Sequence, residues 1–175
     1  MRTTHRSARL ALVLVLSVML AGARTSNQAP PPPGPQEVTV VGVFADSRGQ
    51  HGVLLEAKRD KRRVLMAIGA PEAIAIAVPL EHITPARPLT HDLFLTLFGR
   101  LKISIIKVVI TDLRNNTYYA TVYLAADGAP MELDARPSDA IALALRAKAP
   151  VFVEDRVFDK ADHGPGAPEG SGERI

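Results

Sequence analysis

The chain has 175 residues, a formal net charge of +3 and no cysteine. This length suffices for one domain with a sizeable core. Without cysteine there is no disulfide bond, no thiolate nucleophile and no cysteine ligand for a metal. Three of the 21 lysines and arginines lie in residues 1–23, which hold no acid, so the remaining 18 balance the 18 acidic residues. The basic balance therefore belongs to the N-terminal segment and does not indicate nucleic-acid binding.

Residues 1–23 are typical of a secretory signal peptide. A basic start precedes the uncharged run from Leu10 to Leu20, and Ala21-Gly-Ala23 supplies the small residues that a signal peptidase reads. The run is shorter than the about 20 apolar residues of a membrane span. We therefore expect a periplasmic or secreted protein; an uncleaved N-terminal membrane anchor or a misassigned start codon is the alternative.

The segments that flank the domain lack apolar periodicity. Residues 24–36 contain the proline tract that ends at Pro35, which predicts an extended linker. Residues 160–175 are rich in glycine, proline and charge, with Ile175 as their one bulky apolar residue, which predicts a disordered tail. The domain is accordingly expected at residues 37–159.

From residue 37 to residue 78, apolar residues alternate first at every second position and then with a helical period. The pattern predicts, in order, a strand at Glu37–Ala45, a hairpin of His51–Lys58 with Arg63–Ile68, and a helix from Gly69 to about Val78. Glu72 falls in the first turn of this helix, and Pro79 is expected to end it. Five of the six residues 58–63 are basic, so this hairpin tip is either a solvated edge or a contact for a phosphate backbone.

The second half begins with a helix from His91 to about Lys102, for which Thr90 is the expected N-cap. Its apolar stripe comprises Leu93, Phe94, Leu97, Phe98 and Leu101. The elements that follow are a central strand at Ile103–Asp112, a hairpin of Thr117–Ala125 with Pro130–Ala135, a helix that begins at Pro137, and a short strand at Val151–Glu154. Strands come in pairs and helices in separate groups. The sequence thus predicts a single α+β domain, with a mixed sheet built from hairpins and about three helices packed on it.

Residues 131–148, where a predicted strand leads into a predicted helix, contain both charged and apolar residues. Asp134 and Arg136 share one face of the expected strand, and Asp139 opens the helix, so these charges converge at a strand-to-helix corner. From Ala140 to Leu145 the helix is apolar on every side, which predicts burial on more than one face. We expect a homodimer that buries part of this helix.

Residues 133–144, Leu-Asp-Ala-Arg-Pro-Ser-Asp-Ala-Ile-Ala-Leu-Ala, resemble the signature of the bifunctional nuclease domain family, also filed as a domain of unknown function. Three further motifs occur in the family's order: residues 68–77, residues 87–93, and residues 109–113 followed by 118–120. The resemblance covers about residues 36–159. It implies a nuclease that cleaves DNA or RNA phosphodiesters without strong sequence preference.

The candidate site residues lie at the starts of predicted elements: Asp134, Arg136, Asp139, His91, Asp92 and Glu72. Carboxylates and histidine in this setting are able to hold Mg²⁺ or Mn²⁺, His91 is able to act as a general base, and Arg136 is able to grip a phosphate. The alternative is structural, with acids that complement helix dipoles and an arginine that pairs with Asp134 or Glu132. No motif for an organic cofactor is present. Two functions remain open: a metal-dependent nuclease acting on nucleic acid, or an exported, non-catalytic binding or oligomerisation module.

Export provides the first test. We expect cleavage after Ala23, because the basic start, the short apolar run and the small residues together meet the requirements of signal peptidase. The N-terminal mass of protein recovered from an extracytoplasmic fraction measures this. An intact Met1 on soluble cytoplasmic protein contradicts it.

Overall fold

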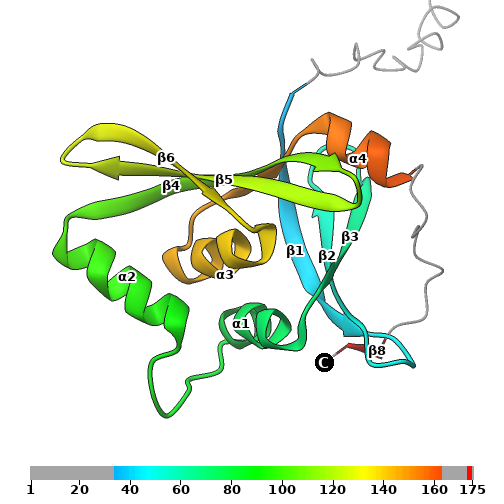
Figure 1. Cartoon of the computed structure of the whole chain (residues 1–175), viewed down its shortest axis with the longest axis horizontal. Helices are drawn as coiled ribbons and strands as arrows, with labels where there is room; N and C mark the ends of the chain where they lie inside the picture. Colours follow the sequence, from blue (N-terminus) through cyan, green and yellow to red (C-terminus); the bar gives the residue numbers. More distant parts are fainter. Residues whose placement is uncertain (1–33, 163–172, 175) are drawn as a thin grey trace, which may run out of the picture. The chain divides into compact units, whose positions relative to one another are not determined.

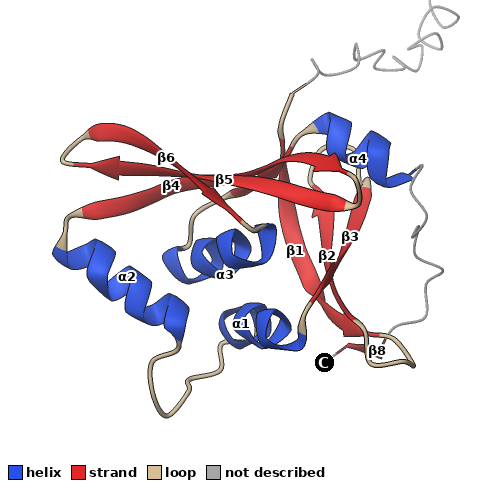
Figure 2. Cartoon of the chain, viewed as in Figure 1, coloured by secondary structure: helices blue, strands red, loops and turns tan. Residues whose placement is uncertain are grey.

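One mixed β-sheet runs through the part of the chain that the computed structural model describes, residues 34–162 and 173–174 (Figures 1 and 2). Its strands are β1 (Gln36–Ala45), β2 (His51–Ala57), β3 (Arg63–Ile68), β4 (Ile103–Arg114), β5 (Thr117–Ala126), β6 (Ala129–Ala135), β7 (Val151–Val153) and β8 (Glu173–Arg174). The order is β3-β2-β1-β7-β4-β5-β6, and β8 pairs with β1. Only the β4–β7 pair is parallel within these residues. The predicted signal peptide lies outside the described residues.

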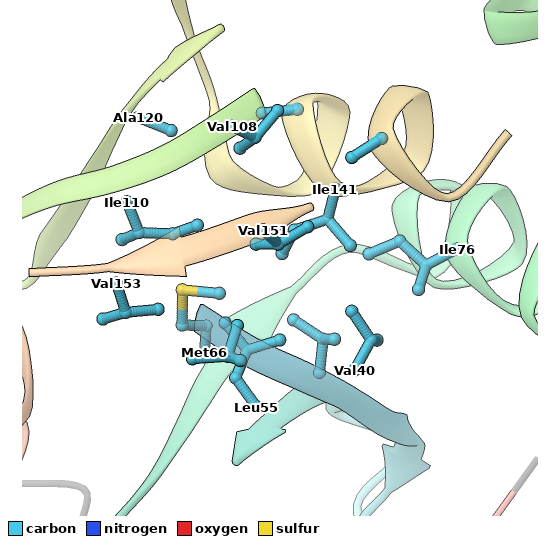
Figure 3. Close-up of a cluster of buried hydrophobic side chains, with 14 of the residues drawn as sticks. Val40, Leu55, Met66, Ile76, Val108, Ile110, Ala120, Ile141, Val151 and Val153 are labelled. Carbon is cyan, nitrogen blue, oxygen red and sulfur yellow. The ribbon is translucent and has the colours of Figure 1, made fainter. Parts of the chain in front are cut away.

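Four helices accompany the sheet in the described ranges: α1 (Ala70–Leu80), α2 (Thr90–Arg100), α3 (Pro137–Ala147) and α4 (Asp155–Asp162). Figure 1 shows β1–β3 and β4–β6 running at a steep angle to each other, with α3 and α1 in the angle between them. The core lies there, where side chains of the sheet meet those of α1 and α3 (Figure 3). Leu55, Met66, Ile76, Ile110 and Ile141 are among its fully covered members.

The predicted α+β class and the predicted hairpins are confirmed. Two tight turns set the register of β4–β5–β6. Asn115 and Asn116 both have positive φ, as do Asp127 and Gly128. Two-residue turns of this kind match the right-handed twist of the strands they join, and asparagine, aspartate and glycine adopt them at the least steric cost. The third helix packs on this part of the sheet and leads into β7.

The prediction that α3 is buried on more than one face is also confirmed. Ala140, Ile141, Ala142 and Ala144 are fully covered, because α1, α2, β4 and β5 all pack on this helix. Three small residues among these four let the neighbouring elements approach closely. Leu145 is partly buried, so most but not all of the apolar surface of α3 is covered by the described residues, and the expected dimer contact at this helix stays a prediction.

Several predicted boundaries were wrong. α1 continues through Pro79 and ends at Leu80. Thr90 is the first residue of α2 rather than its cap, since the N-cap is Leu89. α4 was not predicted, and it extends past the expected domain boundary to Asp162, because Val157 and Phe158 insert into the core.

An amphipathic helix usually packs its apolar stripe against the core, but most of the apolar stripe of α2 faces solvent. Of its five members only Phe98 packs against the core, while the other four are exposed. α2 instead turns His91 and Asp92 toward α3. On the edge strand β6, Met131 and Leu133 are exposed as well. Among the described residues, no helix is both long enough and apolar enough to cross a membrane.

The core position of Ile141 generates a prediction. Ile141→Ala should lower the free energy of unfolding by about 2–5 kcal/mol, because it removes a covered side chain and leaves a cavity between α3 and the sheet. Urea denaturation measures the loss. The matched control is Ile74→Ala on α1, where the side chain is 60% exposed, and for it we expect a much smaller loss of stability. Equal losses in the two variants would contradict the assigned core.

Candidate functional site

The strand-to-helix corner is built around Arg136, the N-cap residue of α3. Its backbone is extended, and Pro137 occupies the first helical position, where its missing N–H has no intrahelical partner to lose. The guanidinium turns back onto Asp139: Nε lies 2.7 Å from Oδ2, and Nη2 lies 3.2 Å from Oδ1. These bonds raise the pKa of Arg136 above its ordinary value. The convergence of Arg136 with Asp139 that the sequence predicted is thus present as a two-point ion pair.

The same guanidinium reaches α1. Arg136 Nη1 lies 2.9 Å from Oε1 of Glu72, in the first turn of that helix. Gly69, the N-cap of α1, lies beside this carboxylate, so a larger residue at position 69 would displace the Glu72 side chain. The sequence predicted Glu72 as a site residue but not its proximity to Gly69.

His91 completes the chain of contacts from the first turn of α2. Its Nε2 lies 3.2 Å from Oδ1 of Asp139, and its side chain is 15% exposed. Burial acts to raise the pKa of Asp139, but the hydrogen bonds with Arg136 and His91 outweigh it and hold that pKa below its ordinary value. Asp139 is therefore an ionised acceptor that fixes the imidazole. The four residues Glu72, Arg136, Asp139 and His91, hereafter the corner cluster, join the first turns of three helices.

Asp92 has a different partner from its neighbour His91. Its Oδ1 accepts from Arg146 Nε at 2.7 Å, and its Oδ2 accepts from the Leu89 N–H at 2.7 Å, which caps α2. Burial acts to raise the pKa of Asp92, but the Leu89 N–H and Arg146 hold it below the ordinary value. Asp92 is thus committed to the helix cap and to a buried arginine. It is not part of the corner cluster.

The sequence did not predict the contacts that Arg146 makes from the last turn of α3. Its side chain is 6% exposed, and Nη1 donates to the carbonyl oxygens of Ala75, at 2.6 Å, and Ala142, at 3.0 Å. Ala75 lies four residues before Pro79, whose ring nitrogen has no hydrogen to donate to that carbonyl. Arg146 supplies the missing donor, which explains why α1 continues through its proline.

Asp134 lies apart from the other candidates. It is exposed on the edge strand β6, opposite Thr121 of β5. The adjacent pair, Ala120 with Ala135, points to the core, so Asp134 points to the other face of the sheet. Between residues 34 and 162, no hydrogen bond or ion pair connects Asp134 with Arg136 or Asp139.

The corner cluster contains residue types that bind Mg²⁺ or Mn²⁺, but their arrangement does not fit an ion. In the described part of the chain, no group of three or more histidine, aspartate or glutamate side chains is placed to hold a metal. Arg136 already bonds Glu72 and Asp139. The donor set as arranged therefore fits a guanidinium between two carboxylates.

The basic hairpin tip between β2 and β3 is paired with acids. The ion pairs are Lys58 with Glu37, Arg59 with Asp155, Lys61 with Glu56, Arg62 with Asp60, Asp155 and Asp159, and Arg63 with Glu56. Arg62 also stacks over the ring of Phe158, 4.8 Å from its centroid. The pairs of Arg59 and Arg62 with Asp155 and Asp159 attach the tip to α4, and the charge of the tip is locally balanced.

Comparisons with known proteins agree with the motifs. A profile of the bifunctional nuclease domain matches residues 53–164, which include the corner cluster. An uncharacterized protein of Mycobacterium tuberculosis is 39% identical over 126 residues, covering 71% of this chain and 75% of that protein. A protein of Oryza sativa subsp. japonica named bifunctional nuclease 1 is 32% identical over 117 residues, covering 64% of this chain and 35% of that protein.

The contact between Arg146 and the proline-containing helix can be tested by a double-mutant cycle. Arg146→Met should lower the free energy of unfolding by about 2–3 kcal/mol, because charge-assisted hydrogen bonds are lost. In a Pro79→Ala background the loss should be smaller by about 1 kcal/mol, because residue 79 then donates its own N–H to Ala75. Urea denaturation measures both, with exposed Arg100→Met as the control. The same loss in both backgrounds would contradict the assigned role of Arg146.

Proposed function

The chain belongs to the bifunctional nuclease domain family, and we propose that it hydrolyses phosphodiester bonds of DNA or RNA at the corner cluster. The observation that carries this proposal is the contact of His91 and Arg136 with one carboxylate, Asp139. A base and a phosphate-binding group are thereby held side by side. The rice relative's name supports the reaction class.

Arg136 is the proposed phosphate-binding residue. A guanidinium carries five N–H donors, and three of them make the bonds to Asp139 and Glu72. The side chain is 65% exposed, so its remaining donors face solvent and are available to a phosphate oxygen. The two carboxylates hold the guanidinium plane in place, which lowers the entropy lost when a substrate binds.

His91 is the proposed proton carrier. Asp139 contacts Nε2, so the imidazole is oriented with its other nitrogen, Nδ1, directed away from the carboxylate. In the proposed reaction Nδ1 takes a proton from water as the water oxygen attacks phosphorus. The bond to the leaving oxygen then breaks, that oxygen takes a proton from solvent water, and His91 releases its own proton to solvent. Arg136 stabilises the additional negative charge on the phosphoryl oxygens.

Dependence on Mg²⁺ or Mn²⁺ remains a separate proposal. Glu72 and Asp139 are the oxygen ligands such an ion would take, and binding it would require Arg136 to release them. No step described above requires the metal. An assay with and without divalent ions decides whether it takes part.

The alternative function is an exported, non-catalytic binding or oligomerisation module. One observation favours it: the charges of the corner cluster satisfy one another, as they do in a purely structural ion-pair network. Under this alternative, loss of His91 would alter stability without removing any activity.

The discriminating experiment is a nuclease assay of the purified chain on labelled single-stranded DNA and RNA, with Mg²⁺, with Mn²⁺ and with a chelator. His91→Ala and Arg136→Ala should each lower the cleavage rate by about 100-fold or more while the chain stays folded. Asp134→Asn is the matched control, because Asp134 is exposed and points to the other face of the sheet. Melting temperatures are measured on the same samples.

Two outcomes contradict the proposal. Absence of cleavage by the wild-type chain under every metal condition would favour the binding module. Loss of cleavage in Asp134→Asn but not in His91→Ala would place the site on the other face of the sheet.

A further inference from the structure

α2 is apolar around more than half of its circumference, because successive side chains are rotated by about 100°. Its inner side, with Leu95 and Phe98, faces α3 together with His91. The other side carries Leu93, Phe94, Leu97 and Leu101, hereafter the α2 patch. These four side chains are 59%, 47%, 51% and 56% exposed. A helix with so wide an apolar surface is normally buried on more than one face.

Nothing in residues 34–162 covers the α2 patch. α2 packs on α3 and β4 alone among the neighbours with substantial contact, and Figure 1 shows it at the margin of the domain, with its far side away from the sheet. Phe94 of the patch contacts Phe98, which packs on the core, edge to face, so the patch is continuous with the core contact. Single exposed leucines are common on soluble proteins, but four on adjacent turns of one helix form a continuous surface.

We infer that the α2 patch is the contact surface of a homodimer, in which α2 of a second copy packs against it. The area supports this occupant. At about half exposure, four side chains of this size leave roughly 400 Å² of apolar surface, about half of the roughly 800 Å² that each partner of a standard interface buries. A polar rim formed by Thr96, Arg100 and Lys102 would complete it.

The spacing of the α2 patch also suits a copy of itself. Leu93, Leu97 and Leu101 follow each other at intervals of four residues and form a continuous ridge. Ridges of this spacing pack into one another in the commonest class of helix contact. A two-fold axis near Leu97 would bring the two ridges together antiparallel, with the helix dipoles opposed.

Two competing occupants fit less well. Addition of strand β6 to the β6 of a second copy would bring Glu132 and Asp134 against their equivalents, and Pro130 interrupts the edge. A helix that lies on a membrane carries a polar face rich in lysine and arginine, whereas Arg100 is the one such residue within α2. The inner side of α2 is moreover occupied by α3.

The test is sedimentation velocity of the full chain at micromolar concentrations. The wild-type chain should sediment as a dimer, and Leu97→Glu should raise the dissociation constant at least ~30-fold, the effect of an interface hot spot. Ile74→Glu is the matched control, because Ile74 is 60% exposed on α1 and lies outside the patch. It should leave the dimer unchanged.

A second measurement uses the absence of cysteine from the chain. Under mild oxidant, Leu97→Cys should give a disulfide-linked dimer and Ile74→Cys should not, which decides the matter even if Leu97→Glu unfolds the chain. The inference is overturned if the wild type is a monomer, or if Leu97→Glu dissociates no more than Ile74→Glu. It is also overturned if a monomeric wild type binds phosphatidylglycerol vesicles and Leu97→Glu does not. None of these outcomes depends on nuclease activity.

Discussion

The arrangement of the three larger helices depends on one buried guanidinium. Arg146 of α3 bonds Asp92 of α2 and the carbonyl oxygen of Ala75 of α1. Its Nη2 has no hydrogen-bond partner among the described residues. A buried unpaired N–H costs about 1–3 kcal/mol, which offsets part of the stabilisation that the other bonds of Arg146 supply. The arginine also contributes specificity, because few relative positions of the three helices satisfy its donors simultaneously.

This interaction also marks a limit of sequence reasoning. Pro79 predicts a helix end because it lacks an N–H and crowds the preceding turn. The compensating donor lies 71 residues from Ala75 in the sequence and becomes its neighbour only when α1 and α3 pack together. Local signals succeeded where the local chain determines the geometry, as at the Asn115-Asn116 turn. They missed α4, whose few apolar residues are buried only because the sheet and Arg62 surround Phe158.

In the candidate site, too, the sequence predicted the local contacts but not those that depend on the packing of the helices. The sequence supplied the residue types and placed Arg136 beside Asp139, since three residues along a first helical turn return to one side. It did not separate His91 from Asp92. Adjacent helical side chains diverge by about 100°, so His91 meets Asp139 while Asp92 meets Arg146. Asp134 lies away from the corner cluster for a related reason. Strand side chains alternate between the two faces of the sheet, and the chain leaves β6 for α3 only after Ala135.

The two sides of α2 connect the proposed catalytic site with the proposed interface. Its inner side holds His91 against Asp139, and its outer side carries Leu97. The N-terminal half is fixed to α3 by the His91–Asp139 hydrogen bond and the Asp92–Arg146 ion pair. The C-terminal half is held on the inner side by Phe98 and by the chain that continues into β4. A second copy packed on the outer side would restrain the whole helix. The distance between His91 and Asp139 would then vary less in the dimer than in a free chain, and any reaction that requires this pair would proceed faster per chain as the fraction of dimer rises.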